Sequence, residues 1–435
     1  MVRPCRDDPQ SGLVGQAGTL SQPSREPSLR FVLTGTFHSL NRGDSAMQLA
    51  AAQTLRALWP EAHIAIHSPN AAADRNLYRE FAVLACSRRR PLAALRAVAR
   101  AALWRATSGR VPLSVELQSY RKATVVIDLS GDGLTETFGW RCPLSHTIPL
   151  LLAHLLRVPF CLMAQTIGPF HRFRPWFRWI LSRAAFITAR DADTFRYLSA
   201  WNLPCPVELT ADVAFLLEPG SQTAATAYLR SLGDFDPSRP TLGITPSNLY
   251  NVKSPKNGSR RARLQDCLSA VSSVCASFSR NVGAQVLVIP HVFGPGEVYD
   301  DRGSAEILAA AITAAGRKPL VVKDALAPPE LKALIRCCDL FVGFRMHSVI
   351  AAVSQAIPVL AIAYSPKLNA LMERLGVGEF ATDLFALEAD TLSDLLMKLW
   401  SEKTRIKESL NRIISRDVLP AARENFGFLR RQIGL

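Results

Sequence analysis

The chain has 435 residues, which is longer than one hydrophobic core usually supports, so we expect two domains. Its 48% of hydrophobic and 20% of charged residues are typical of an ordinary globular protein. A formal net charge of +15 predicts anionic partners, which could be phosphorylated metabolites, an acidic membrane surface or nucleic acid. We expect no nucleic acid partner, because no known nucleic-acid-reading motif accompanies the charge.

The cysteines and the apolar runs exclude two further classes. None of the nine cysteines stands in a C-x-x-C pair, which argues against a metal cage and a disulfide framework and fits a reducing cytoplasm. We therefore predict neither a metal nor a cofactor. Charged and polar residues interrupt the longest apolar runs, so no spanning helix is expected, and the protein should be soluble or rest on a membrane surface.

The order of predicted elements indicates the fold. Residues 1–29 are rich in Pro, Ser, Gly and charge and predict a disordered tail. From residue 30 to 217, short apolar strands such as "RFVLT" alternate with helical runs such as "DSAMQLAAAQTLRALW", which predicts an N-terminal α/β domain. Turn formers in 218–240 predict a linker. The alternation returns in 241–400, which predicts a second α/β domain, and a helical segment is expected at 401–435.

This pattern predicts two doubly wound Rossmann-like domains that face a cleft. In such sheets ligands bind beyond the carboxyl ends of the strands, so those ends are where site residues should be sought. The first predicted strand ends in "GTFHSLNRGDSA", which supplies Asn41, Gly43 and Asp44. Asp44 or Ser45 could cap the following helix, and free backbone N–H groups could meet an anion there, although a simple capped turn explains the same residues.

Two further strand ends lie in the first half. "LSGDGLTETFG" contains Gly131, where backbone can approach a ligand closely, beside hydroxyl and carboxylate groups that suit a polyhydroxy acceptor. "FITARDADT" contains Arg190 followed by Asp191, which could form an anion clamp or a salt-bridged helix cap.

The second half supplies the stronger signals. "VIPHVFG" places His291 at a strand end, where it could be structural or catalytic. "LFVGFRMHS" ends in Arg345, which can grip a phosphate or carboxylate with two N–H groups, and His347, a proton carrier near neutrality. Strand alternation would leave Met346, between them, facing the core. Ser348 should begin a helix whose positive end attracts anions, and Lys367 ends the neighbouring strand.

Two basic segments bear on whether the protein contacts a membrane. The segment from Arg88 to Arg110 carries seven arginines and no acid, with Leu92, Leu95 and Leu103 at helical spacing, and "HRFRPWFRWILSR" mixes arginines with aromatic residues. Both suit helices that lie in a membrane interface, and both also suit ordinary helices packed on a sheet with solvated arginines.

"GFRMHSVIAAVSQAIPVLAIAYSPKLNALMERLG" resembles the most characteristic segment of the polysaccharide pyruvyl transferases, with R-x-H-S, an apolar helix and a Y-x-x-K strand end in that order. "NRGDSA", "LSGDGLTETFG", "QTIGPF", "ITARDADT" and "ADVAF" follow the sequence order of that family's other segments. The resemblance covers roughly residues 30 to 400. It implies a fold similar to B-type glycosyltransferases and transfer of pyruvate from phosphoenolpyruvate to two hydroxyls of a sugar as a cyclic ketal.

By the same resemblance, Arg345 and His347 match the active-site arginine and histidine of the family, and Arg190 matches its second anion-binding arginine. We hypothesise that His347 is the general acid. The partners would be phosphoenolpyruvate and a sugar, oligosaccharide or lipid-linked saccharide, the last of which would bring the protein to the inner face of an anionic membrane. The alternatives are a B-type glycosyltransferase with a nucleotide-sugar donor and a non-catalytic anion-binding protein.

Overall fold

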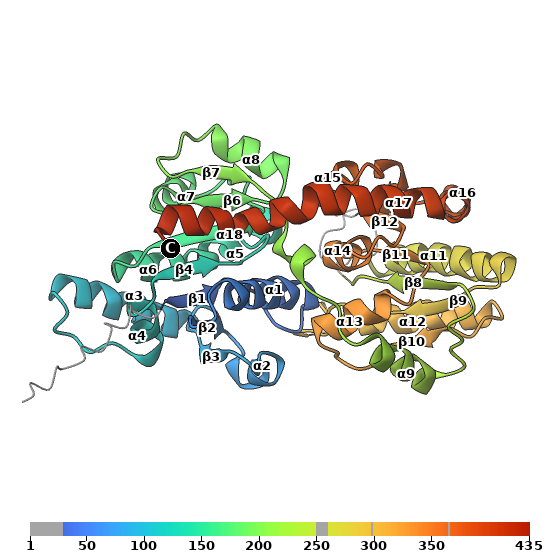
Figure 1. Ribbon diagram of the computed structural model, residues 1–435, viewed down its shortest axis with the longest axis horizontal. Helices are drawn as coiled ribbons and strands as arrows, with labels where there is room; N and C mark the ends of the chain where they lie inside the picture. The colour runs from blue at the N-terminus through green and yellow to red at the C-terminus, as the bar shows by residue number, and fades with distance from the viewer. Residues whose placement is uncertain (1–28, 249–259, 297–298, 364–365) are drawn as a thin grey trace, which may run out of the picture.

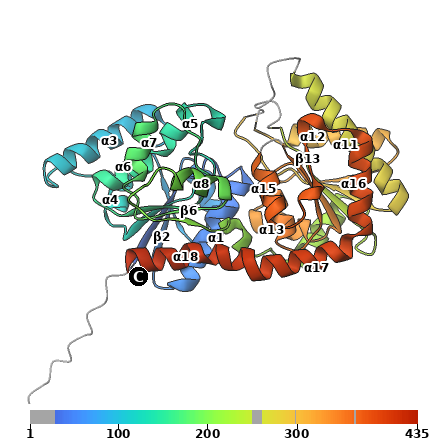
Figure 2. The ribbon, with the colours of Figure 1, turned by 90° about the horizontal axis from the view of Figure 1, so that it is seen from above.

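The computed structural model describes residues 29–248, 260–296, 299–363 and 366–435 and shows two α/β domains side by side (Figure 1). The predicted tail lies, except for Leu29, outside the described residues. Each domain is a parallel sheet with helices on both faces (Figure 2). The predicted fold class is therefore confirmed.

The first sheet has seven parallel strands in the order β3-β2-β1-β4-β5-β6-β7. Its central strands are buried at every position, as in β4 ("VVID") and β5 ("FCLMAQ"), because helices cover both faces. The order reverses between β1 and β4, and a crevice for ligands opens at such a reversal. The strands are β1 (Arg30–Thr34), β2 (His63–Ser68), β3 (Ala82–Ala85), β4 (Val125–Asp128), β5 (Phe160–Gln165), β6 (Ile187–Ala189) and β7 (Val207–Leu209).

The second sheet has six strands in the order β10-β9-β8-β11-β12-β13. Its reversal falls between β8 and β11, so the segment after β11 lies at the position where a ligand is expected. The strands are β8 (Thr241–Thr245), β9 (Gln285–Val288), β10 (Leu320–Val321), β11 (Leu340–Gly343), β12 (Val359–Ala363) and β13 (Ala381–Asp383).

Helices connect successive strands, and several begin with a side chain that accepts a hydrogen bond from a free backbone N–H, such as Ser114 before α4 and Ser221 before α9. The first domain contains α1 (Arg42–Leu58), α2 (Ala71–Leu77), α3 (Pro91–Ala106), α4 (Val115–Arg121), α5 (Arg141–His146), α6 (Ile148–Leu155), α7 (Arg174–Leu181) and α8 (Ala192–Ser199). The rest of the chain contains α9 (Gln222–Leu232), α11 (Arg260–Val282), α12 (Arg302–Ala314), α13 (Pro328–Ile335), α14 (Met346–Val353), α15 (Pro366–Arg374), α16 (Ala389–Ser401), α17 (Lys403–Ile413) and α18 (Leu419–Ile433). Among the described helices, none combines the length and the apolar character needed to cross a membrane.

The chain passes between the domains twice. Helix α9 lies within residues 218–240, the predicted linker. The predicted C-terminal helical segment runs back along α17, through a π-helical stretch at Ile414–Val418, and ends with α18 on the first domain (Figures 1 and 2). There the buried Asn425 accepts hydrogen bonds from the hydroxyls of Thr188 (2.5 Å) and Thr210 (3.0 Å) and donates to the carbonyl of Ala211 (2.9 Å).

The two domains also share apolar packing. A single cluster of buried residues runs from Phe31 on β1 through Val213 to Leu340 on β11. The backbone N–H of Arg42 donates to the carbonyl of His291 (3.1 Å), so the start of α1 touches the loop after β9. These contacts hold the carboxyl ends of the two sheets against one another.

Candidate active site

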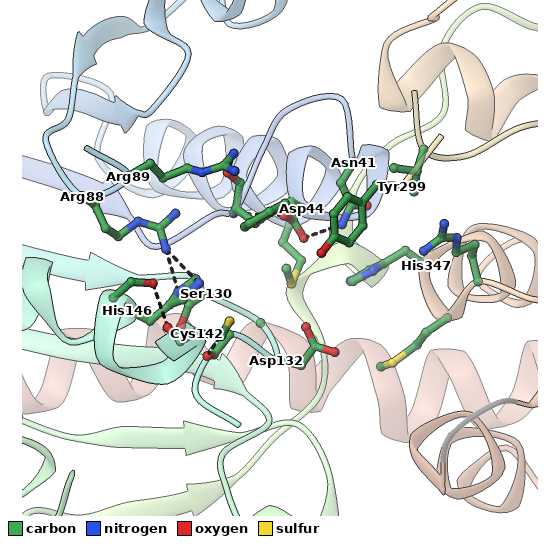
Figure 3. Close-up of a pocket in the computed structure, with 18 of the residues that line it drawn as sticks. Asn41, Asp44, Arg88, Arg89, Ser130, Asp132, Cys142, His146, Tyr299 and His347 are labelled. Carbon is green, nitrogen blue, oxygen red and sulfur yellow. Dashed lines mark hydrogen bonds between the residues drawn. The ribbon is translucent and has the colours of Figure 1, made fainter. Parts of the chain in front are cut away.

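A cavity of about 440 Å³ lies between the domains, within the usual range of ligand pockets, about 300–1,000 Å³. The first domain contributes the segments after β1, β3, β4 and β6, and the second contributes those after β9 and β11. Figure 3 shows side chains from both domains pointing into this space. The cavity therefore lies where the carboxyl-end rule predicts a ligand.

His347 stands at the second domain's end of the cavity, in the first turn of α14. Its Nε2 lies 3.4 Å from Oδ2 of Asp212. Its ring packs over Gly43, the second residue of α1, so closely that an added Cβ there would lie 2.3 Å from Nδ1. Met346 is half-buried: it packs against the core, as predicted, and also lines the cavity. The reason differs from the predicted one, because α14 begins at Met346 and strand alternation no longer applies.

Asp212 joins His347 to Arg190. Nη1 of Arg190 donates to Oδ2 of Asp212 at 2.7 Å, and both side chains are almost fully buried. Burial opposes ionisation of Asp212, but Arg190 and His347 outweigh it and hold the pKa of this carboxyl well below its usual range. Asp191 instead caps α8, accepting a hydrogen bond from the N–H of Thr194 at 2.8 Å. Arg190 thus forms its ion pair with Asp212, and the helix cap beside it is a separate interaction.

Arg345 lines the cavity in a second buried ion pair. Its Nε and Nη2 donate to the two carboxylate oxygens of Asp301 at 3.1 and 2.5 Å. Burial raises the pKa of Asp301, and Arg345 counteracts that rise. Both arginines that the sequence predicts to bind anions therefore already have an aspartate partner, and their positive charge is partly balanced.

His291 is buried in the cavity wall, and neither ring nitrogen has a hydrogen-bond partner among the described residues. Burial, together with the nearby His347 and Arg345, holds the pKa of His291 well below its usual value. The ring is therefore neutral, with one nitrogen that can donate and one that can accept, and both nitrogens are buried.

The first turn of α1 supplies a carboxylate, that of Asp44. Asn41, and not Asp44 or Ser45 as predicted, caps α1, because the helix begins at Arg42 and the side chain of Asn41 accepts from the N–H of Gly43 (3.1 Å). Asp44 accepts from the N–H of Phe37 (3.0 Å) and the amide of Asn41 (3.1 Å) and lines the cavity. Burial raises the pKa of Asp44 to about 6, although His347 acts to lower it.

The remaining predicted site residues lie in or beside the cavity. Gly131 lines it with a φ of 64°, a conformation that favours glycine. Lys367 donates to Asp132 at 2.9 Å across the domains and lines a neighbouring hollow with Arg190. Ser348 is fully buried and donates to the carbonyl of Arg345 (2.8 Å), so it supports the first turn of α14.

Several cavity residues are absent from the sequence prediction. Arg88 and Arg89 follow β3, and Arg141, Cys142 and His146 come from α5. The carboxyl-end rule applied to β3 would have found the two arginines, but "AVLA" carries little strand signal, and the segment was interpreted only as a basic surface. Within the described ranges, His, Cys, Asp and Glu form no group of three or more that could hold a metal ion.

The fold and the cavity define a two-domain α/β protein of the B-type glycosyltransferase architecture, with an arginine-rich site between its domains. Residues 41–366 match the family described as polysaccharide pyruvyl transferase, and the chain belongs to this family. This confirms the resemblance found in the sequence.

The chain is similar to "Amylovoran biosynthesis protein AmsJ" of Erwinia amylovora, at 25% identity over 267 residues, and the match spans 60% of this chain and 62% of that protein. Among solved structures it resembles the UDP-GlcNAc 2-epimerase of Neisseria meningitidis bound to UDP-GlcNAc, with a TM-score of 0.58, 10% identity and 93% and 99% of the two chains covered. It also resembles a glycosyltransferase of Rickettsia africae, with a TM-score of 0.56, 10% identity and 94% and 99% covered. At these identities the structural likeness concerns the fold alone.

Proposed function

We propose that the protein transfers pyruvate from phosphoenolpyruvate to two hydroxyls of a sugar, in a cell-surface polysaccharide or its precursor, as a cyclic ketal. Membership of the pyruvyl transferase family supports this reaction. The observation that carries it is the position of His347, which lies in the cavity between domains, against Asp212 and beside Arg345 and Arg190.

Phosphoenolpyruvate brings a phosphate and a carboxylate, and this end of the cavity offers several groups that bind anions. Nη2 of Arg190 donates to no residue in the described part of the chain. His291 has a ring N–H to donate, and the first turn of α14 directs backbone N–H groups toward an anion. Arg345 contributes positive charge beside them, even while it is paired with Asp301.

Two ionisable side chains, those of His347 and Asp44, carry the protons in the proposed reaction. His347 gives its proton to the methylene carbon of phosphoenolpyruvate while a sugar hydroxyl attacks the adjacent carbon. Asp44, ionised above a pKa of about 6, accepts the proton of that hydroxyl. Phosphate then leaves with the proton held by Asp44, and the second hydroxyl closes the ketal on the same carbon and gives its proton to His347, which restores both side chains. A general acid typically contributes a factor of about 100 to 10,000.

The test measures phosphate release from phosphoenolpyruvate with a panel of sugar acceptors, and nucleotide sugars serve as alternative donors. We expect release only when phosphoenolpyruvate and an acceptor are both present, and we expect His347→Gln to lower it about 100-fold or more while phosphoenolpyruvate still binds. Turnover of a nucleotide sugar alone would show a glycosyltransferase instead. Near-normal turnover by His347→Gln would remove the general-acid role.

We also propose that α3 rests on an anionic membrane at the inner face of the cell envelope. Its alanines Ala94, Ala97 and Ala101 are buried against the domain, whereas Leu92, Leu95 and Leu103 are 70%, 66% and 53% exposed beside arginines. Outward-facing leucines with basic neighbours suit a membrane interface. In α7, by contrast, Phe177, Ile180 and Leu181 are buried, so the second basic segment packs as an ordinary helix.

Liposome sedimentation at low salt tests this contact. Vesicles with anionic lipid should bind the protein, and Leu92→Ser with Leu95→Ser should abolish binding. The control is Leu58→Ser, which changes a leucine that is 52% exposed at the end of α1. Failure of the wild-type protein to bind, or equal loss in the control, would contradict the contact.

A further inference from the structure

Three further arginines line the cavity: Arg88, Arg89 and Arg141. Figure 3 shows Arg88 and Arg89 at one end, His347 at the other, and Asp44 and Asp132 between them. Arg190 and Arg345, in the same cavity, each have an aspartate partner. Arg88, Arg89 and Arg141 form no ion pair within the described part of the chain.

Arg88 is the most buried of the three. Only 5% of it is exposed, and its guanidinium donates to the carbonyl of Thr36 (2.5 Å) and contacts the ring of His146 (2.9 Å). Burial and the charge of Arg88 hold the pKa of His146 well below its usual value, so His146 is neutral and does not balance the arginine. Arg88 interacts electrostatically with the buried carboxyl of Asp128 but forms no ion pair with it. A buried guanidinium that lacks a close partner is costly, and an anionic ligand would pair with it directly.

Arg89 and Arg141 extend this positive end toward solvent. The guanidinium of Arg89 lies 4.2 Å from the ring centre of Phe37, and that of Arg141 lies 5.1 Å from the ring of Trp140. Stacking on a ring fixes the plane of a guanidinium and leaves its N–H edge for a ligand. Pro91, the first residue of the 16-residue helix α3, lines the cavity next to them, so the positive end of that helix faces the same place.

Phosphoenolpyruvate cannot supply this anion while it reacts at His347. Its phosphate oxygen and its methylene carbon are bonded to the same carbon atom, so a phosphate at the arginine end would place the reacting carbon there too. An anionic group bound at Arg88, Arg89 and Arg141 during the reaction would therefore belong to the second substrate.

We propose that these three arginines form a subsite for the phosphate or diphosphate ester of the acceptor sugar, and that the sugar ring spans the cavity between them and His347. Several arginines with a helix N-terminus are the groupings that proteins use for phosphate esters. The subsite rests on the proposed function, which places pyruvyl transfer at His347. A lipid-linked and a nucleotide-linked sugar both carry this ester.

The experiment compares kcat/KM for one sugar offered as a neutral glycoside, a 1-phosphate, a nucleoside diphosphate ester and a lipid diphosphate ester. We expect the kcat/KM of the wild-type protein to be at least tenfold higher for an ester than for the neutral glycoside. Whichever diphosphate ester, nucleoside or lipid, gives the higher kcat/KM identifies the form in which the acceptor sugar is supplied. Arg89→Gln with Arg141→Gln should reduce that preference about tenfold or more, because both residues are exposed at the mouth and can be replaced without disturbing the core. The control is Arg423→Gln, an exposed arginine on α18, which should keep the full preference.

Equal kcat/KM for ester and glycoside in the wild-type protein would overturn the subsite. A rise in KM for phosphoenolpyruvate in the double variant, without a change in acceptor preference, would also overturn it and assign the arginines to the donor. Inorganic pyrophosphate binding, measured by calorimetry at saturating phosphoenolpyruvate, should weaken about tenfold in the double variant. This readout does not depend on turnover, so it separates failure of the subsite from failure of the proposed reaction.

Discussion

Nε2 of His347 lies 3.4 Å from the carboxylate of Asp212, and the same oxygen accepts a hydrogen bond from Arg190 at 2.7 Å. One buried aspartate thus orients the proposed acid and balances one of the arginines. His347 belongs to the second domain and Arg190 to the first, so the carboxylate also fixes how the domains meet.

Asp212→Asn should lower kcat and stability together. The change leaves Arg190 buried without a counter-charge, which typically costs about 3–5 kcal/mol of unfolding free energy, and it removes the charge that faces His347. Asp301→Asn is the matched comparison, since it removes the carboxylate from the ion pair with Arg345 without touching His347. Chemical denaturation should show similar losses for the two variants, and kinetics well below the melting temperature should show the larger loss of kcat for Asp212→Asn. Equal losses of kcat would mean that Asp212 acts only through Arg190.

Gly43→Ala should reduce kcat about 100-fold, the scale of a lost general acid, because the new methyl group would lie 2.3 Å from Nδ1 of His347 and displace the ring. The control is Gly303→Ala. Gly303 is the second residue of α12, as Gly43 is of α1, but an added Cβ at Gly303 meets no atom within 4 Å. Activity assays should find the control unchanged, and a fully active Gly43→Ala would show that His347 can work from another position.

The pH dependence of the rate should report Asp44. Burial raises the pKa of Asp44 to about 6, and a base acts in its ionised form, so kcat should rise as the pH increases through about 6. Asp44→Asn should remove this rising limb and leave a low rate at every pH. Asp128 also has a pKa raised by burial to about 6 but does not line the cavity, so Asp128→Asn should keep the limb. A rising limb that survives in Asp44→Asn would exclude Asp44 as the base.

Asn425→Ala should destabilise the first domain although Asn425 lies on α18, which follows the second domain in the chain. The change leaves the buried hydroxyls of Thr188 and Thr210 and the carbonyl of Ala211 without their partner, at a cost of about 2–4 kcal/mol. Asn411→Ala, at an exposed position of α17, is the control and should change stability little. Denaturant unfolding measures both, and equal effects would show that α18 is not anchored by Asn425.

The sequence predicted the fold well because the alternation of short apolar strands and longer helices is a local pattern. It also placed His347, Arg345, Arg190 and His291 correctly at strand ends, since the end of a strand is marked by the residues beside it. Their partners escaped prediction: Asp301 lies 44 residues before Arg345 and Asp212 lies 135 residues before His347 in the chain. Only tertiary packing brings these carboxylates to the cavity, and no local pattern encodes that contact.

The arginines of the proposed phosphate subsite show a second reason why the sequence did not predict the whole site. Arg88 and Leu92 lie in one basic stretch, yet Arg88 points into a buried site and Leu92 points to solvent. The side-chain direction changes between these two residues because β3 ends before Arg88 and α3 begins at Pro91. Without a clear strand signal at Ala82–Ala85, sequence alone assigned the whole stretch to one surface.

The return of the chain along α17 and α18 has a consequence for synthesis. All seven strands of the first sheet are made by Leu209, but the helix that satisfies Thr188 and Thr210 is translated only after the whole second domain. The polar groups of Thr188 and Thr210, in the interior of the first domain, therefore stay uncovered while the whole second domain is translated. Domains usually fold one after another as they emerge. Here the half that emerges first is completed last.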